Sequence, residues 1–157
     1  MSDDLTEKVD YPLYIVTASS GEEMSGCLAG FVTQSSIKPV RFIVCISRVN
    51  HTYGVADRGT ALGLHLLGSD QRDLAMLFGE ASGDSIAKFE EVAWSKGATG
   101  VPILTECAAW VEGPILSRMS AGDHEAFLIA ARDGGRGGHA GQFMKDRASD
   151  FEPGHPA

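Results

Sequence analysis

A run of four small polar residues is the first group in this sequence with the chemistry to bind a ligand. Thr33, Gln34, Ser35 and Ser36 stand at the end of an expected β-strand and precede a turn closed by Pro39. Their hydroxyl and amide groups, together with backbone N–H groups, can surround a phosphate. Such a run is by itself more often a hydrophilic turn, so it predicts an anion site only in company with other groups.

A second polar group follows the very next expected strand. It contains Ser47, Asn50, His51 and Thr52, and Asn50 can cap a short helix through its side-chain oxygen. In a meander or Greek-key arrangement the two polar groups lie at neighbouring strand ends. They can then hold one anion together, with Arg48 or His51 supplying positive charge.

The five histidines raise the question of a metal site. No two of them are four positions apart, the spacing that places two ligands on one face of a helix, and we expect no metal. His65 alternates with two leucines in an expected strand and should point to the opposite face from them. His51 and His124 lie beside turn residues, where side chains often face a site. For either one alone, a surface histidine is the plainer interpretation.

Two familiar enzyme motifs are not supported by the sequence. The glycines between positions 134 and 141 do not follow a buried strand or open a helix, and they indicate a flexible linker rather than a phosphate loop. A serine hydrolase would need a Gly-x-Ser-x-Gly segment, which does not occur. Asp123 and His124, as neighbours on a strand, are expected to face opposite ways.

The elements that must position these residues follow from composition and spacing. Short β-rich runs cover residues 13–18, 28–33, 41–47 and 61–67, and strand-like composition returns at 104–116 and 125–132, joined by a turn at 117–123. Residues 70–78 predict an amphipathic helix ended by Gly79, and residues 82–91 a second helix with Ile86 and Phe89 inward. The chain is therefore predicted to be mainly β with a helical insert, in a barrel or sandwich.

Two regions follow from this division of the chain. Residues 1–132 are expected to form the folded domain. Residues 133–157, rich in glycine and proline, are expected to form a loose tail with one short turn at 142–145.

Composition limits the class of protein. A chain of 157 residues with 43% hydrophobic residues is sized for one domain with an ordinary core. Its formal charge of −8 argues against nucleic-acid binding, which needs a basic surface, but not against one bound phosphate. No apolar run is long enough to span a membrane. Three widely spaced cysteines are typical of reduced thiols, and we expect a cytoplasmic protein.

Several segments, taken in chain order, resemble one known family. They are PLYIVTA from Pro12, GCLAGFVTQSSIKP from Gly26, FIVCIS from Phe42, NHT from Asn50, LAMLFG from Leu74, KF from Lys88, GVPIL from Gly100 and GDH ending at His124. Each motif is weak, but the ordered set, ending in Gly-Asp-His before a strand, is specific. The set is similar to the flavin reductase-like FMN-binding family over roughly residues 10 to 132.

The resemblance implies a split β-barrel with Greek-key topology that forms a homodimer, with the flavin sites near the subunit interface. Members of the family typically use NADH or NADPH to reduce FMN or FAD, and many pass the reduced flavin to a monooxygenase. We therefore expect NAD(P)H-dependent flavin reduction, with FMN favoured over FAD. The alternative is a flavoprotein that holds FMN as a tight prosthetic group for electron transfer.

The resemblance also implies roles for individual residues. The segment Thr33, Gln34, Ser35 and Ser36 matches the part that binds the ribityl and phosphate groups, and Ser47, Asn50, His51 and Thr52 match a second phosphate-side segment. Phe78 and Lys88 match positions of the helical insert near the cofactor. His124 matches the histidine that faces the nicotinamide and the flavin ring. The sequence differs from many relatives in having Pro39-Val40 in place of Pro-Pro, and in running into a glycine-rich tail after the last expected strand.

Overall fold

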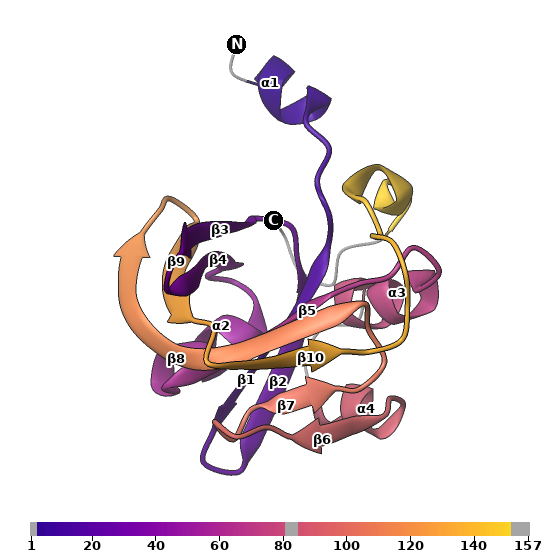
Figure 1. The fold of residues 1–157 in the computed structure, drawn as a ribbon. Helices are drawn as coiled ribbons and strands as arrows, with labels where there is room; N and C mark the ends of the chain where they lie inside the picture. The colour runs from indigo at the N-terminus through magenta and orange to yellow at the C-terminus, as the bar shows by residue number, and fades with distance from the viewer. Residues whose placement is uncertain (1–2, 81–84, 152–157) are drawn as a thin grey trace.

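The computed structural model describes residues 3–80 and 85–151, with side chains from position 87 onward in the second range. Within these residues, an antiparallel sheet of eight strands forms the body of the molecule (Figure 1). The path runs β2-β1-β5-β8-β9-β4-β3, and β10 pairs with the free side of β8. A separate two-stranded sheet joins β6 to β7.

The strands and helices have the following bounds: α1 Asp3–Lys8, β1 Tyr14–Ser20, β2 Glu23–Ala29, β3 Val32–Ile37, β4 Val40–Ser47, α2 His51–Arg58, β5 Ala61–Leu66, α3 Arg72–Glu80, α4 Ser85–Glu90, β6 Trp94–Lys96, β7 Pro102–Leu104, β8 Ala109–Ser120, β9 His124–Ala130, β10 Asp133–Arg136 and the 3-10 helix η1 Lys145–Ala148. No helix in the described ranges is long and apolar enough to cross a membrane.

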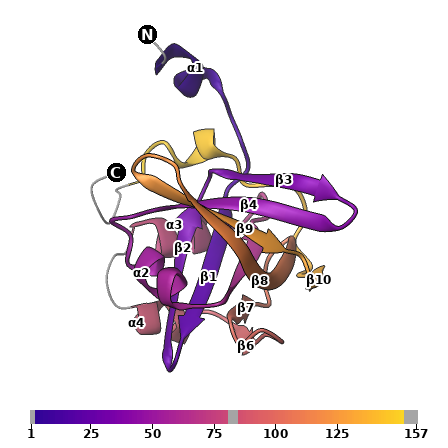
Figure 2. The same ribbon diagram turned by 90° about the vertical axis from the view of Figure 1, so that its left-hand side faces the viewer.

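The long strand β8 gives the sheet its shape. Its first half pairs with β5 and β10, and its second half pairs with β9 after a register shift between Ile115 and Ser117. The β3–β4 hairpin therefore runs across the direction of β1 and β2, as Figure 2 shows. Strands β4 and β5 follow one another in the chain, but β8 and β9 lie between them in the sheet. The mainly β fold with a helical insert that the sequence predicts is confirmed.

Two apolar clusters fill the two sides of this arrangement. The larger lies between the strands and beneath α2, and includes Val16, Ile46 and Phe127. The second packs α3 and α4 against β1 and β2, and includes Phe78, Phe89 and Phe143. The inward position predicted for Phe89 is confirmed, since 2% of it is exposed. The predicted inward position of Ile86, and residues 82–84 of the same predicted helix, lie outside the described side chains and residues.

Several predicted boundaries are wrong, for identifiable reasons. The run 28–33 is not one strand, because the chain turns a corner at Gly30 and Phe31 between β2 and β3. The polar residues 33–36 form part of β3 rather than a turn, since Thr33, Gln34 and Ser36 pair with β4 and the register shifts at Ser35. Likewise, residues 117–120 continue β8, because they pair with β9.

Gly79 does not end its helix. It lies inside α3, where a Cβ atom would come within 2.7 Å of Leu28 Cδ2. The glycine therefore lets α3 pack closely against β2, a role that a helix-ending pattern does not reveal.

The prediction of a loose tail from Asp133 onward is wrong for residues 133–151. Residues 133–136 form β10 against β8, and Phe143 is fully buried in the second cluster. Glycine permits this packing: at Gly137 a Cβ would lie 2.3 Å from the Cys107 carbonyl oxygen. The predicted short turn at 142–145 is replaced by a bridge from Met144 to Pro12 and by η1. Residues 152–157 of the predicted tail lie outside the described residues.

Candidate functional site

A pocket of about 200 Å³ lies where the β2–β3 corner meets the end of β4 and the start of β9. Its walls combine apolar side chains, two thiols and a few neutral polar groups: Tyr11, Leu13, Cys27, Leu28, Ala29, Gly30, Phe31, Cys45, Ile46, Ser47, Asn50 and His124. No carboxylate is among these described lining residues. We call this the corner pocket.

His124 is the first residue of β9 and pairs with Ser47 of β4 across the sheet. Its Nδ1 lies 2.7 Å from Oδ1 of Asp123. A carboxylate only accepts hydrogen bonds, so Nδ1 carries a proton and donates. The same contact lowers the pKa of Asp123. The expectation that Asp123 and His124 face opposite ways is wrong, because Asp123 precedes β9 and belongs to the turn.

An aromatic ring packs against this imidazole. The ring centroid of Phe31 lies 5.1 Å from that of His124, and the Tyr11 ring approaches Phe31 edge-on at 5.9 Å. Phe31 is nevertheless 53% exposed. The corner pocket therefore has an aromatic rim that is open on one side.

The second polar group of the sequence lies at the start of α2. The side chain of Asn50 accepts a hydrogen bond from the Thr52 N–H at 2.9 Å, so the predicted helix cap is confirmed. The Thr52 hydroxyl is buried and lies 2.6 Å from that of Ser25. Ser47 and Asn50 thus line the pocket, while Thr52 supports the helix from beneath.

The two thiols of the pocket are not activated nucleophiles. Burial raises the pKa of Cys27 to about 11, against a smaller lowering effect of its hydrogen bond with Thr52. Burial also raises the pKa of Cys45. Both groups therefore stay protonated near neutral pH and contribute apolar surface to the walls.

The structure places other expected site residues elsewhere. His51 lies 3.0 Å from Glu23, which also pairs with Arg58. Arg48 donates to the Gly122 carbonyl and to Ser120, and so pins the β8–β9 turn. Neither side chain is among the described lining residues of the corner pocket.

The first polar group and the helical insert also lie outside the pocket walls. Thr33, Gln34, Ser35 and Ser36 occupy the edge strand β3, where the Gln34 amide donates to the Ser36 carbonyl at 3.0 Å. Phe78 and Lys88 are buried beneath β2. The Lys88 ammonium lies 3.5 Å from the Gly26 carbonyl and 5.5 Å from the Phe78 ring centroid, and burial lowers the pKa of Lys88.

Of the sequence candidates, the structure thus brings together Ser47, Asn50 and His124. It adds Phe31 and Gly30, which sequence reasoning did not single out, and it places Asp123 in contact with His124, which sequence reasoning did not expect. The available signal was the glycine inside an apparent strand, since such a glycine often marks a bend or a close backbone approach. A Cβ at Gly30 would lie 2.3 Å from the Tyr11 ring, which explains why the corner requires glycine.

The arrangement is suited to holding a flat, partly apolar molecule beside an imidazole. In the described residues no group of three His, Cys, Asp or Glu side chains could hold a metal ion. The pocket's only titratable groups besides the two protonated thiols are His124 and the Tyr11 phenol, whose pKa is raised chiefly by burial. Such a site orients molecules by stacking and hydrogen bonds.

Comparisons with known proteins agree with this architecture. The model of the flavin reductase like domain matches residues 6–148. A ferric-chelate reductase (NAD(P)H) of Archaeoglobus fulgidus is 32% identical over 128 residues, which cover 80% of this chain and 76% of that protein. An FMN reductase (NADH) of Bradyrhizobium diazoefficiens is 29% identical over 115 residues. That match covers 73% of this chain and 63% of the relative.

A solved structure has the same fold. The flavin reductase domain protein from Arthrobacter sp. FB24 superposes with a TM-score of 0.81, at 25% identity, over 90% of this chain and 87% of that one. The matched region of the family model includes the C-terminal segment up to η1. The chain belongs to the flavin reductase-like domain family.

Proposed function

We propose that this protein is an NAD(P)H-dependent flavin reductase that binds FMN in the corner pocket. The observation that carries the proposal is the pocket itself, in which the His124 imidazole and the segment that leads into α2 flank an apolar slot. Membership of the family supports flavin reduction. The similarity to an FMN reductase (NADH) supports FMN as the flavin.

The residues of the corner pocket fit a flavin by their chemistry. Leu28, Ala29 and Phe31 offer apolar and aromatic surface to a ring system. At the other end, Ser47 adjoins the first turn of α2, which contains no acidic residue. Helix N-termini attract phosphate through free N–H groups and the helix dipole. We therefore assign the phosphate to the Ser47 and Asn50 end.

The chain's own part in the reaction is positioning. A bound flavin would accept a hydride from the nicotinamide, and this chemistry belongs to the cofactors. Asp123 holds the Nδ1 proton of His124 and fixes the orientation of the imidazole. Phe31 packs against that ring and limits its rotation. The imidazole can then offer its other nitrogen to the reactants, or carry a positive charge beside reduced flavin.

The size of the pocket supports a homodimer. At about 200 Å³ it is smaller than the roughly 300 Å³ at which sites for whole cofactors begin. The rim residue Phe31 is 53% exposed. Val49, which lies in the chain between the lining residues Ser47 and Asn50, is 58% exposed. We propose that a second copy covers this rim and completes the site.

The similarity to an FMN reductase (NADH), which is named for reducing FMN as a substrate, favours exchange of flavin over tight retention. A flavin-dependent monooxygenase would then be the partner that takes up the reduced flavin. The three cysteines are free thiols, which supports a reducing compartment such as the cytoplasm.

The direct test is anaerobic turnover. The purified protein is mixed with NADH or NADPH and with FMN or FAD, and loss of flavin absorbance is followed. We expect turnover above the buffer rate, fastest with FMN, and a colourless protein after gel filtration. Absence of bleaching with all four pairs would overturn the proposal. A yellow protein that retains its flavin through gel filtration without such turnover would favour the prosthetic alternative.

Two variants separate the roles within the pocket. His124→Ala should lower the reduction rate more than flavin affinity, whereas equal losses would show a binding role. Ser47→Ala should lower the affinity for FMN more than the affinity for riboflavin, because riboflavin lacks the phosphate. Ser36→Ala, on the edge strand, is the matched control. If Ser36→Ala alone selectively lowered the affinity for FMN, the phosphate site would have to be assigned to the 33–36 segment.

A further inference from the structure

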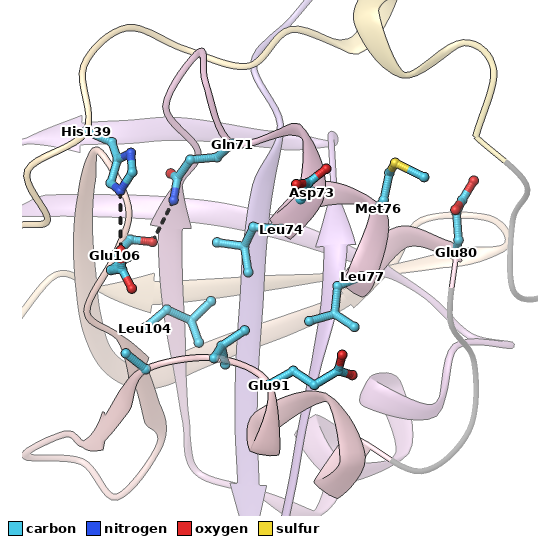
Figure 3. Close-up of a pocket in the computed structure, with 12 residues that line it drawn as sticks. Gln71, Asp73, Leu74, Met76, Leu77, Glu80, Glu91, Leu104, Glu106 and His139 are labelled. Atoms are coloured by element: carbon cyan, nitrogen blue, oxygen red, sulfur yellow. Dashed lines mark hydrogen bonds and ion pairs between the residues drawn. The ribbon is translucent and has the colours of Figure 1, made fainter.

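A second and larger cavity lies on the side of α3 that faces the segments around β6 and β7. Its volume is about 760 Å³, within the range of roughly 300 to 1,000 Å³ that is typical of small-molecule sites. It shares no lining residue with the corner pocket. We call it the α3 cavity, and Figure 3 shows its walls.

The floor of the α3 cavity is apolar. Leu74 and Leu77, three positions apart on α3, lie opposite Leu104 of β7 (Figure 3), and Val92 also lines the cavity. Leu104 is 1% exposed and belongs to the second apolar cluster, against which the other three pack. The floor is therefore part of the folded core and does not depend on a mobile surface loop.

The rim of the cavity is acidic. Four carboxylates line it, from Asp73, Glu80, Glu91 and Glu106, and no lysine or arginine is among its described lining residues. Among the described residues, neither Asp73 nor Glu91 forms a salt bridge. Uncompensated charge of one sign around an apolar concavity concentrates ligands of the opposite sign.

One end wall is held in place by hydrogen bonds. Gln71, 7% exposed, donates to the Glu106 carbonyl and accepts from the Gly68 N–H, both at 2.9 Å. His139 reaches the same wall from the C-terminal segment, with Nδ1 3.0 Å from Asp70 and Nε2 3.8 Å from Glu106. The cavity is thus preformed, which lowers the entropic cost of binding.

These observations together define one class of ligand. An apolar floor takes up hydrocarbon or aromatic surface, and the carboxylates of Asp73 and Glu91 can attract and bind an ammonium group. Flavins and nicotinamide nucleotides do not fit, because their phosphates would face the same carboxylates. We propose that the α3 cavity binds an organic cation, namely an ammonium compound with an aromatic or aliphatic body.

This site is independent of flavin reduction, so each can fail without the other. Calorimetric titration of the whole protein tests it with three probes of similar size: benzylammonium, benzyl alcohol and phenylacetate. We expect the cation to bind at least tenfold more tightly than the alcohol, and the anion to show no binding. Added sodium chloride should lower the affinity for the cation. Equal affinity for the three probes would overturn the proposal.

Variants locate the binding. Asp73→Asn combined with Glu91→Gln should lower the affinity for the cation at least fivefold, while the midpoint temperature of thermal unfolding stays unchanged. Glu22→Gln, an exposed acid in the β1–β2 turn, is the matched control and should bind normally. If the double variant does not fold, Glu106→Gln serves instead, with a loss of at least twofold expected. Unchanged affinity in the folded variants, or binding of a lysine- and leucine-containing peptide but not of the ammonium probe, would refute a small-cation site.

Discussion

The buried imidazole of His65 predicts a specific loss of stability in mild acid. His65 lies in β5 with no exposed surface. Its Nε2 accepts a hydrogen bond from the Leu104 N–H at 3.0 Å, so the ring proton is on Nδ1, which donates to the Ile15 carbonyl at 2.9 Å. Both ring nitrogens are satisfied only in the neutral form. Burial lowers the pKa of His65 to about 4, against smaller opposing effects of the Ile15 carbonyl and Glu112.

The size of the effect follows from the difference between folded and unfolded states. The unfolded imidazole has a pKa near 6.5, so between pH 6.5 and pH 4 the unfolded chain binds more protons than the folded one. The contribution of neutral His65 is therefore complete above pH 6.5 and is lost as the pH falls. The loss of folding free energy, relative to neutral pH, amounts to about 2 kcal/mol at pH 5 and about 3 kcal/mol below pH 4, at 1.36 kcal/mol for each pKa unit.

Urea unfolding followed by tryptophan fluorescence measures this loss. The protein is compared at pH 7.5 and pH 5 with His65→Gln, whose amide can donate and accept but does not titrate. The variant should be less stable at pH 7.5, yet the original protein should lose about 2 kcal/mol more between the two pH values. Equal losses in the two proteins, or an NMR titration of the His65 ring near pH 6.5, would refute the reasoning.

Two further predictions concern the C-terminal segment and the corner pocket. Phe143→Ala should lower the free energy of unfolding by about 3–5 kcal/mol, because it empties a fully buried site; Phe31→Ala, at a half-exposed ring, is the control, and equal losses in the two would contradict the packing argument. Asp123→Asn should lower the reduction rate on the order of tenfold through misorientation of His124 while leaving flavin affinity unchanged, and nitrogen NMR should then show the His124 proton on both ring nitrogens. An unchanged tautomer in a slower variant would show that Asp123 acts in another way.

Local sequence patterns predicted the features that depend on local interactions. Asn50 caps α2 as expected, because a cap needs only a side-chain oxygen two residues from its N–H partner. The alternation around His65 correctly indicated a strand. It did not reveal that both faces of β5 are buried, since burial depends on what packs above and below the sheet.

The features that the sequence did not predict depend on contacts between distant segments. Strand β10 is Asp-Gly-Gly-Arg, a sequence with low strand propensity, and it is a strand because β8 offers an unpaired edge. The corner pocket arises in the same way, from residues of β2, β4 and β9 that meet only in the folded sheet. The family resemblance supplied the type of site, but its polar residues on β3 lie outside the pocket walls.

The contact between residues 11–13 and residues 143–145 has a consequence for shortened forms of the protein. The backbone N–H of Leu13 donates to the Phe143 carbonyl at 2.8 Å, and the backbone N–H of Lys145 donates to the Tyr11 carbonyl at 2.9 Å. Tyr11 and Leu13 also line the corner pocket. Without residues 143–145, the segment that contains Tyr11 and Leu13 would lose these backbone partners. We therefore expect a protein shortened before Phe143 to lose the corner pocket even where its strands still form.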